Sequence, residues 1–240
     1  MPADTPLSGR VTVVTGASRG IGYASALALA KAGSHVIALA RTQGGLEDLD
    51  DAIKTAGADA TLVPIDLKSP DSLDQLASII LERWGRLDGL FGNAGLLGEI
   101  MPAPQISPKT FDDVMAVNMT ANYRLIRALD PLLRASPSGR ALFVTSSVGR
   151  SHRAYWSAYA ASKAALEAYV SCYAKEVSVT NLRVNLLDPG AVRTAMRAKA
   201  MPGEDASVLP SPAEIAPLVV DMLSPDYDKN DHLARYRDLV

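Results

Sequence analysis

The sequence predicts an α/β fold in which a single doubly wound parallel sheet carries helices on both faces. Short apolar runs rich in β-branched residues alternate with longer segments of helical periodicity, and no long linker or low-complexity tract interrupts them. Repeated strand–helix–strand units form right-handed crossovers, so their strands lie parallel. The expected strands are Arg10–Thr15, Val36–Leu39, Ala60–Ile65, Gly89–Gly92, Arg140–Thr145 and Leu182–Leu187, with the faintest pattern at His232–Tyr236.

Three helix starts are marked by a serine followed by a proline, at Ser69-Pro70, Ser107-Pro108 and Ser211-Pro212. A serine hydroxyl can cap the free N–H groups of a first helical turn, and the fixed φ of proline suits the first helical position. Glu214 stands three residues after Ser211 and completes a capping box. These signals place helices after the third, fourth and sixth expected strands.

Length and composition favour one domain. The 240 residues are 48% hydrophobic, which is enough for one substantial core. We expect a single domain over residues 1–240, with a short tail at 1–8. The segment 195–210 is a candidate substrate loop: its residues Met196, Met201 and Val208 would cover a modest apolar pocket, or the segment is simply a mobile loop.

Charge patterning argues against several classes of partner. Lys and Arg total 24 against 26 Asp and Glu, and no basic run stands out, so neither a nucleic-acid surface nor an anionic-membrane patch is indicated. The start has no apolar signal core, and no apolar segment approaches the ~20 residues that span a bilayer. We therefore expect a soluble, cytoplasmic protein. The three histidines are scattered, which predicts no metal site, and the lone Cys172 is expected to be a small buried hydrophobe.

A glycine-rich turn follows the first strand. Thr15 to Gly22 reads T-G-A-S-R-G-I-G and leads into a helical stretch, so the spacing is G-x-x-x-G-x-G. Glycines there allow a tight turn and a close approach of the backbone to a phosphate, while the helix N-terminus offers free N–H groups and a positive dipole end. The sequence thus predicts a dinucleotide pyrophosphate site, although a lone glycine turn would also suit a simple connection.

Two arginines predict which dinucleotide binds. Arg41 ends the second strand, where many dinucleotide folds carry an acidic residue for the adenosine ribose, and Arg19 lies in the glycine turn. Because guanidinium groups fork onto phosphate oxygens, the two arginines would clamp a ribose 2′-phosphate. NADP(H) is therefore expected in preference to NAD(H). The alternative is that both arginines are solvated surface residues.

Other polar residues and turns follow later strands, and these strand ends meet at one edge of a parallel sheet. Asp66 could accept a hydrogen bond from an adenine amino group, and Ser146 could hold a substrate oxygen. Each one alone is as consistent with a turn or a loop cap. The segments concerned are Asp66-Leu67, Asn93-Ala94-Gly95, Ser146-Ser147 and Asp188 to Thr194.

Tyr159 and Lys163 stand four residues apart in a helical pattern, so a phenol and an ammonium group emerge on one helix face. A neighbouring cation favours the ionised phenol, so we expect a lowered pKa and a group suited to acid–base work. The pair alone would more often be an ordinary surface contact. The motifs around it favour the catalytic interpretation.

Together these segments resemble the short-chain dehydrogenase/reductase family, in order from about Gly9 to Thr194. The resemblance implies a Rossmann-type fold and a catalytic tetrad of Asn118, Ser146, Tyr159 and Lys163, with Ser146 rather than Ser147 fitting the family's register. It implies that Thr194 hydrogen-bonds the nicotinamide carboxamide. The implied cofactor contacts are Gly16, Ser18, Arg19, Gly20, Ile21, Gly22, Arg41, Asp66, Leu67, Asn93, Ala94, Gly95, Tyr159, Lys163, Pro189, Gly190, Val192 and Thr194.

The resemblance also implies the chemistry, which is hydride transfer between a nicotinamide and a carbonyl or secondary alcohol, with Tyr159 as proton donor. Lys163 would hold the nicotinamide ribose, and Asn118 would hold a water that resupplies protons. A protein that binds NADP(H) as a sensor or scaffold without turnover is the alternative. Sugar-nucleotide epimerases use a similar Tyr/Lys pair, but they need a larger carboxyl-terminal domain than this chain has room for.

Three further expectations concern the surroundings of the site. The segment between Gly149 and Tyr159 should border the substrate opening, where two arginines would favour an anionic substrate or would simply be solvated. The segments Phe111–Leu133 and Ser157–Val177 could pair with their copies, giving a homodimer or homotetramer, or be satisfied within one subunit. The chain lacks the glycine-rich stretch that leads many family members into a final strand, which puts that strand in doubt. The residues expected at the opening are Arg150, His152, Arg153, Tyr155 and Trp156.

Overall fold

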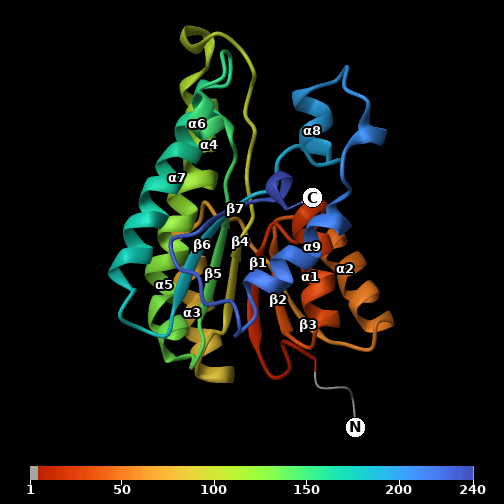
Figure 1. Cartoon of the computed structure of the whole chain (residues 1–240), viewed down its shortest axis with the longest axis vertical. Helices are drawn as coiled ribbons and strands as arrows, with labels where there is room; N and C mark the ends of the chain where they lie inside the picture. The colour runs from red at the N-terminus through yellow and green to blue at the C-terminus, as the bar shows by residue number, and fades with distance from the viewer. Residues whose placement is uncertain (1–4, 240) are drawn as a thin grey trace.

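The structure, a computed structural model, describes residues 5–239, with only the backbone described at residues 70 and 71. Within these residues, parallel strands form one sheet in the order β3-β2-β1-β4-β5-β6-β7 (Figure 1). Each expected strand is present to within one residue at either end, which confirms the predicted fold class. The strands are β1 Val11–Thr15, β2 His35–Ala40, β3 Ala60–Pro64, β4 Gly89–Gly92, β5 Arg140–Val144, β6 Arg183–Asp188 and β7 Leu233–Arg235.

Helices cover both faces of the sheet (Figure 1). On one face α3, α5 and α7 pack over the strands, and on the other α1, α2 and α9 do so. The longer helices are α1 Gly20–Lys31, α2 Gln43–Thr55, α3 Pro70–Trp84, α4 Pro108–Met115, α5 Ala121–Ala135, α7 Ser157–Glu176 and α9 Pro212–Met222. The shorter ones are η1 Ala103–Gln105, η2 Ala116–Thr120, α6 Val148–Ser151, α8 Ala195–Ala200, η3 Ala206–Val208 and η4 Tyr236–Asp238.

The central strand β5 shows how the two cores are separated. Phe143 belongs to the cluster formed with Leu129 of α5 and Leu166 of α7, whereas its neighbour Leu142 belongs to the cluster that contains Leu29 of α1. Successive side chains of a strand point to opposite faces of the sheet. A strand covered on both faces must therefore be apolar throughout, which explains why the expected strands appear as continuous apolar runs.

The helix starts follow the serine–proline signals. Ser107 is the N-cap of α4, and its side chain accepts a hydrogen bond from the backbone N–H of Thr110 at 3.1 Å. The carboxylate of Glu214 accepts from the backbone N–H of Ser211 at 2.6 Å, in the capping box at the start of α9. Ser69 precedes α3, but its hydroxyl caps no backbone N–H and instead accepts a hydrogen bond from Ser72.

A π-helical turn joins α4 to α5. The expected helical segment Phe111–Leu133 is continuous in path, but η2, at Ala116–Thr120, has the wider hydrogen-bond spacing of a π-helix. Asn118 lies fully buried in this turn, and its backbone carbonyl accepts a hydrogen bond from Nδ2 of Asn122 at 2.8 Å. Such single π turns often lie at functional sites.

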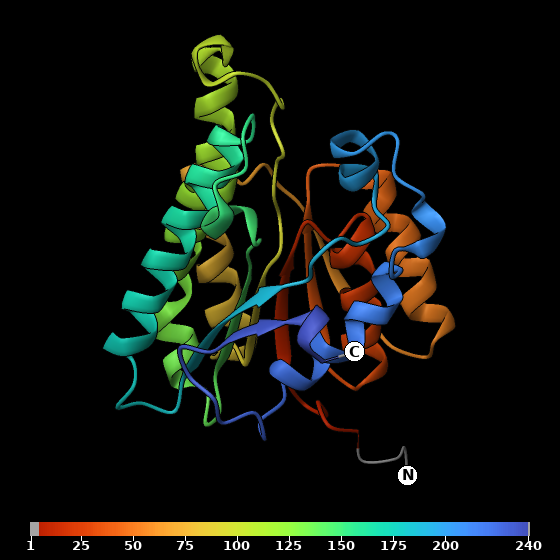
Figure 2. The same ribbon diagram turned by 45° about the horizontal axis from the view of Figure 1, so that its top comes forward.

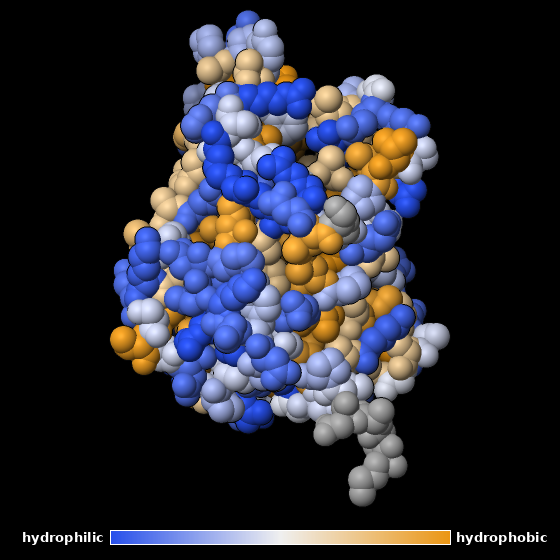
Figure 3. Space-filling view, in the orientation of Figure 1, coloured by the Kyte–Doolittle hydropathy of each residue, from blue (hydrophilic) through white to orange (hydrophobic). Residues whose placement is uncertain are grey.

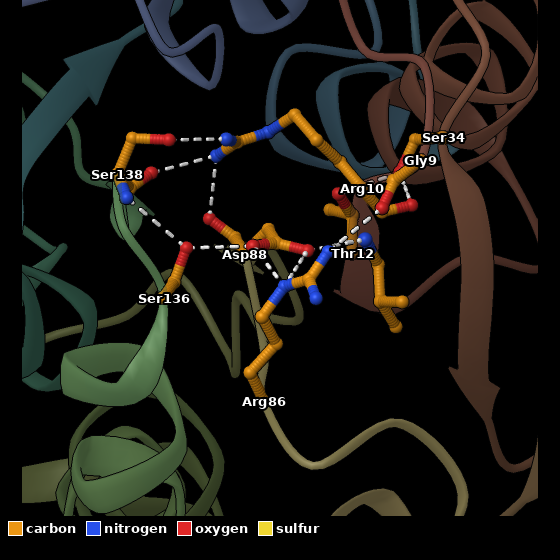
Figure 4. A network of polar contacts seen from close by, with 9 residues as sticks. Gly9, Arg10, Thr12, Ser34, Arg86, Asp88, Ser136 and Ser138 are labelled. Carbon is orange, nitrogen blue, oxygen red and sulfur yellow. Dashed lines mark hydrogen bonds and ion pairs between the residues drawn. The ribbon is translucent and has the colours of Figure 1, made fainter.

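The amino ends of three strands are tied by a buried polar network (Figure 4). The carboxylate of Asp88 accepts hydrogen bonds from Ser136 Oγ at 2.6 Å and from Arg86 Nε at 3.0 Å. The Arg10 guanidinium donates to Ser138 Oγ at 2.7 Å and to the Asp88 carbonyl at 2.7 Å. Because these hydrogen bonds join residues at the beginnings of β1, β4 and β5, they hold the three strand ends relative to one another.

The two ends of the described chain pack onto the domain. Residues 1–4 of the expected tail lie outside the described residues. Leu7 is 1% exposed and its N–H donates to the Ala32 carbonyl at 2.9 Å, so residues 5–8 do not form a free tail. At the other end β7 pairs in parallel with β6, with Ala234 beside Leu187, so the final strand forms.

Cys172 was expected to be buried, and this expectation is wrong. Cys172 lies on α7 and is exposed. Leu166, Val170 and Tyr173 form the buried stripe of this helix, and Cys172 falls outside their three- and four-residue spacing. A helical pattern therefore places a small side chain correctly in a helix without placing it on the inner face.

The carboxyl edge of the sheet is bordered on two sides. Figure 2 shows the long segment after β4, drawn in yellow, on one side of this edge and α8, drawn in blue, on the other. Figure 3 shows hydrophilic residues over the outer parts of the molecule, with apolar residues exposed between them around α9.

Among residues 5–239, no helix is both long and apolar enough to cross a membrane.

Candidate active site at the carboxyl edge of the sheet

The glycine turn between β1 and α1 has no room for side chains. Gly16 has a φ of +67°, a conformation that disfavours residues with a Cβ. A Cβ on Gly22 would lie 2.2 Å from the Gly16 carbonyl oxygen and 2.5 Å from Nδ2 of Asn93. The start of α1 has no side-chain cap, so its first N–H groups remain available to an anion.

The turn after β4 is fastened to the glycine turn. The Thr15 hydroxyl accepts hydrogen bonds from the backbone N–H groups of Asn93 and Ala94, both at 3.0 Å. The Asn93 side chain donates to the Thr15 carbonyl at 2.9 Å. These contacts cross the point between β1 and β4 where the strand order reverses, which is where ligands bind in open α/β sheets.

A cavity of about 1110 Å³ lies at this edge of the sheet. It is lined by every residue predicted to contact the cofactor except Gly22, and also by Ser146, Tyr159 and Lys163. Gly22 and Asn118 are not among the residues that line the cavity. The volume slightly exceeds the ~300–1000 Å³ usual for one small ligand, so a cofactor and a substrate can share the cavity.

Tyr159 and Lys163 share one face of α7 beside the end of β5. The Lys163 ammonium lies 5.7 Å from the centre of the Tyr159 ring and donates to the Val144 carbonyl at 2.8 Å. Lys163 is 3% exposed and Tyr159 is half-buried. The Ser146 hydroxyl is close enough to hydrogen-bond the phenol. Helix α7 and the segment after β5 thus bring a phenol, an ammonium group and a hydroxyl to one place.

Burial controls the proton affinities of this pair. It raises the pKa of Tyr159 to about 12, and the negative charge of Asp188 adds to the rise while the hydrogen bond with Ser146 opposes it. Burial also lowers the pKa of Lys163 to about 8, against the opposing fields of Glu167 and Asp188. The expected fall in the phenol pKa is therefore wrong for the ligand-free protein, because desolvation outweighs the neighbouring cation.

Asn118 does not line the cavity, and its side-chain amide binds neighbouring groups of the protein. Its Oδ1 accepts from the Leu96 N–H at 2.7 Å, and its Nδ2 donates to Ser162 Oγ at 2.9 Å. A Cβ on Gly95 would lie 3.5 Å from Asn118 Oδ1 and 3.8 Å from Lys163 Nζ. Gly95 is thus a common neighbour of the Asn118 amide and the Lys163 ammonium group.

The far end of the cavity carries the two predicted phosphate-binding arginines. Arg19 and Arg41 are both exposed and both line the cavity. Asp66 is exposed nearby, and its Oδ1 accepts a hydrogen bond from the Lys68 N–H at 3.0 Å. This end therefore offers two cations and a carboxylate that solvent can reach.

The turn after β6 closes another side of the cavity. Asp188 Oδ1 accepts a hydrogen bond from the Gly190 N–H at 3.1 Å, which stabilises the turn. Thr194 is the N-cap of α8, and its hydroxyl accepts from the Arg197 N–H at 3.2 Å. Because this bond uses only a lone pair, the Thr194 hydroxyl hydrogen remains free to be donated into the cavity.

A family model described as short chain dehydrogenase matches residues 10–205. The chain belongs to the short-chain dehydrogenase/reductase family. It is accordingly an oxidoreductase of the class that acts on alcohol and carbonyl groups. The resemblance recognised from the motifs is confirmed.

Relatives of this short-chain dehydrogenase cover nearly its whole length. The uncharacterized oxidoreductase YciK of Escherichia coli is 42% identical over 228 residues, which are 94% of this chain and 90% of YciK. A 3-oxoacyl-acyl-carrier-protein reductase of Vibrio cholerae is 32% identical, covering 92% of each protein. A crystal structure of a short-chain dehydrogenase from Escherichia coli CFT073, complexed with NADPH, has a TM-score of 0.93 and 40% identity over 98% of this chain and 100% of its own.

The cavity lining of this short-chain dehydrogenase includes apolar side chains near Tyr159. Leu96, Leu97, Trp156 and Met196 line the cavity, and the guanidinium of Arg153 lies 5.6 Å from the Trp156 ring centre. The expected opening was therefore only partly right. The other three residues assigned to it, Arg150, His152 and Tyr155, lie outside the cavity lining.

The segment 195–210 differs from the expected loop. Its first part forms α8, where Met196 lines the cavity, whereas Met201 does not line it and Val208 is 73% exposed. Lys199 on α8 donates to the Gly98 carbonyl at 3.4 Å, a contact between the two sides of the cavity. Apolar side chains alone thus did not identify which residues face the pocket.

The short-chain dehydrogenase site also contains an ion network that was not predicted. Arg150 was expected to border the substrate opening, facing an anionic substrate or solvent, but its partly buried guanidinium pairs with Glu167 and Asp188. Glu167 stands one turn after Lys163, so helical spacing could have identified it as a neighbour of the site. Arg150 gives no such local signal, because its partners lie 17 and 38 residues further on.

Within the described residues, no group of three or more His, Cys, Asp or Glu side chains is arranged to hold a metal ion.

Proposed function

We propose that this protein is an NADP(H)-dependent oxidoreductase that transfers a hydride between the nicotinamide and a carbonyl or secondary alcohol substrate. The proposal rests chiefly on the convergence of Tyr159, Lys163 and Ser146 in the cavity that also contains the glycine turn. Membership of the short-chain dehydrogenase/reductase family supports it. A small-molecule substrate suits the apolar lining on the Trp156 side.

The residues present fit a dinucleotide cofactor. The side-chain-free cradle at Gly16 and Gly22 and the open N-terminus of α1 suit a pyrophosphate. Arg19 and Arg41 would hold a 2′-phosphate, and the NADPH complex of the Escherichia coli relative supports this choice over NAD(H). We propose that the other residues that the family resemblance implies also contact the cofactor. Gly22 does not line the cavity, and its proposed role is to keep the shape of the glycine turn. Bound there, the cofactor supplies or accepts the hydride.

Tyr159 is the proposed proton donor during carbonyl reduction. With its pKa raised to about 12 by burial, the phenol keeps its proton at neutral pH, which is the form that reduction requires. Lys163 supplies a positive charge and would hold the nicotinamide ribose. Its pKa of about 8 leaves most of the ammonium charged at neutral pH.

Ser146 and Asn118 complete the proposed catalytic set. The Ser146 Oγ accepts a hydrogen bond from the Val148 N–H at 3.3 Å, so its own hydrogen can be donated, to the Tyr159 phenol in the ligand-free protein and to the substrate oxygen in the proposed complex. Asn118 would support proton resupply near Lys163. In this structure the Asn118 amide is engaged with Leu96 and Ser162, so any water would bind beside Asn118 through groups that these contacts leave free.

The test combines turnover and binding. Purified protein is assayed for NADPH oxidation with a panel of ketones, aldehydes and quinones, and NADPH binding is measured by fluorescence. We expect turnover with at least one carbonyl class and a clear preference for NADPH over NADH. Tyr159→Phe should bind NADPH normally and lose about 100-fold or more in kcat, as expected for removal of a general acid.

Three results would count against the proposal. Binding without turnover across the whole panel would favour a sensor or scaffold that keeps the fold without the reaction. Near-normal turnover by Tyr159→Phe would remove the phenol from the mechanism. Equal use of NADH would remove the proposed role of the two arginines.

A further inference from the structure

Arg150 connects the elements that carry the proposed catalytic groups. It lies on α6, the short helix that follows Ser146. Its Nη1 donates to Glu167 on α7, one turn beyond Lys163, and its Nη2 donates to Asp188 at the end of β6. One guanidinium therefore bridges the Ser146 segment, the helix of the Tyr/Lys pair and the strand that leads into the turn beside the cofactor.

The helix that carries Arg150 packs directly against α7 (Figure 1). A Cβ on Gly149 would lie 3.0 Å from the Ala164 nitrogen and 3.2 Å from the Lys163 Cβ. The backbones thus meet with no side chain between them at Lys163 itself. The segment that follows Ser146 is therefore packed tightly against the backbone at Lys163.

The network is buried enough for its charges to matter. The side chains of Arg150, Glu167 and Asp188 are 30%, 16% and 6% exposed, and Glu167 also accepts from Thr145 Oγ1 at 2.6 Å. One guanidinium faces two carboxylates. Removing it would leave two poorly solvated negative charges beside the ammonium group.

The carboxylates act on both members of the catalytic pair. Glu167 and then Asp188 raise the pKa of Lys163, and Asp188 raises the pKa of Tyr159. Two other elements near Lys163 and Glu167 contribute uncharged groups. Element η2 contributes the amide of Asn118, and β5 leads to Thr145. Arg150 is the cation that pairs with both of these carboxylates.

We propose that Arg150 is a positioning residue of this active site, which holds Glu167 and Asp188 so that Ser146, Tyr159 and Lys163 keep their mutual geometry and protonation. The inference rests on the proposed function for the roles of those three residues. The bridge itself rests on the contacts alone.

The first test replaces the arginine with a side chain of similar length and no charge, Arg150→Met. Titration of Lys163 is followed by NMR of isotope-labelled lysine side chains in the ligand-free protein, and the signal is assigned by its absence in Lys163→Met. We expect the Lys163 pKa to rise by about one unit, because two carboxylates lose their cation. We also expect kcat for NADPH-dependent reduction of the best panel ketone to fall about tenfold or more, with a much smaller change in NADPH affinity.

Matched variants separate the causes. Arg134→Met removes an exposed arginine paired with Asp130 on α5, and should leave both the Lys163 pKa and kcat unchanged. Arg150→Lys keeps the charge and loses the fork, so it should preserve the Lys163 pKa better than it preserves kcat. The double variant Arg150→Met/Glu167→Gln removes one of the freed carboxylates and should return the Lys163 pKa toward the wild-type value.

An unchanged Lys163 pKa in Arg150→Met would overturn the electrostatic role, and an unchanged kcat would overturn the positioning role. If Arg150→Met does not fold, Glu167→Gln tests the same network from its other side. It should lower the Lys163 pKa because it removes the strongest opposing field, and no change would overturn the proposal. Failure of the proposed function is distinguishable, because it would show as normal turnover by Tyr159→Phe and would leave the titration unaffected.

Discussion

The proton affinity of Tyr159 depends on its burial more than on its charged neighbour. The sequence places Lys163 four residues away, which by itself predicts a lower phenol pKa. In the folded chain the ammonium group points to the Val144 carbonyl, and loss of solvent raises the phenol pKa to about 12. The raised pKa suits the proposed role of Tyr159 in reduction, because the phenol keeps the proton that this role requires it to give.

The pH dependence of reduction should reflect Lys163. In the proposed mechanism reduction requires protonated Tyr159 and charged Lys163, and burial lowers the Lys163 pKa to about 8. We therefore expect kcat/KM for carbonyl reduction to fall as pH rises through about 8, whereas alcohol oxidation, which needs the phenolate, should continue to increase with pH. Steady-state profiles in both directions measure this. A reduction profile that is flat across pH 8 would contradict it.

Arg41 should discriminate between the two nicotinamide cofactors. Arg41→Ala removes a guanidinium that would form charge-assisted hydrogen bonds to a 2′-phosphate, and each such bond contributes ~1.5–3 kcal/mol. We expect KM for NADPH to rise about tenfold or more, while KM for NADH changes little. Arg83→Ala on α3, outside the cavity lining, is the matched control. Equal losses with both cofactors would show that Arg41 does not read the phosphate.

At the scale of elements, the site depends on close approaches between backbones. The glycine turn, the turn after β4 and helix α1 meet where a Cβ on Gly22 would overlap the Gly16 carbonyl oxygen. The same principle operates at Gly149, where α6 meets α7. The sequence shows where the glycines are. The tertiary structure shows which neighbouring backbone leaves no room for a Cβ at each of them.

Replacement of Gly22 should damage both binding and stability. In Gly22→Ala the new methyl group would lie 2.2 Å from backbone, so the turn must move. We expect a loss of NADPH binding of about tenfold or more and a fall in Tm, because overpacking costs ~1–3 kcal/mol. Fluorescence binding and thermal unfolding measure these effects. Gly44→Ala on α2, which has nothing within 4 Å, should be neutral or slightly stabilising.

At the scale of the whole molecule, the long helices α5 and α7 of one face share an aromatic pair of which one member is exposed. Tyr123 on α5 is 39% exposed and packs edge-on against Tyr169 of α7, with ring centres 5.9 Å apart. We propose that α5 and α7 pair with their copies in a homodimer or homotetramer. We also propose that residues 1–240 form one domain, since every strand of the described chain belongs to one sheet, and calorimetry should accordingly show a single unfolding transition.

The proposed assembly can be tested at its centre. Tyr123→Glu places a charge where the two copies would meet, and burial of an unpaired charge is unfavourable. We expect light scattering to give a dimer or tetramer for the wild type and a smaller species for the variant, with the fold retained in circular dichroism. Lys31→Glu, at the exposed end of α1, is a suitable control. Arg86→Glu is not, because Arg86 binds Asp88. A wild-type monomer would refute the pairing.

The sequence by itself determined the order of strands and helices, the glycine turn and the Tyr159/Lys163 pair, because hydrophobic periodicity, turn chemistry and helical spacing are local properties. The tertiary structure alone decided the inward direction of Arg150, the exposure of Cys172 and the raised pKa of Tyr159. Each depends on neighbours distant in the chain or on the solvent that those neighbours exclude. Local patterns place a residue on an element, whereas its partners and its dielectric surroundings are set by the packing of elements against one another.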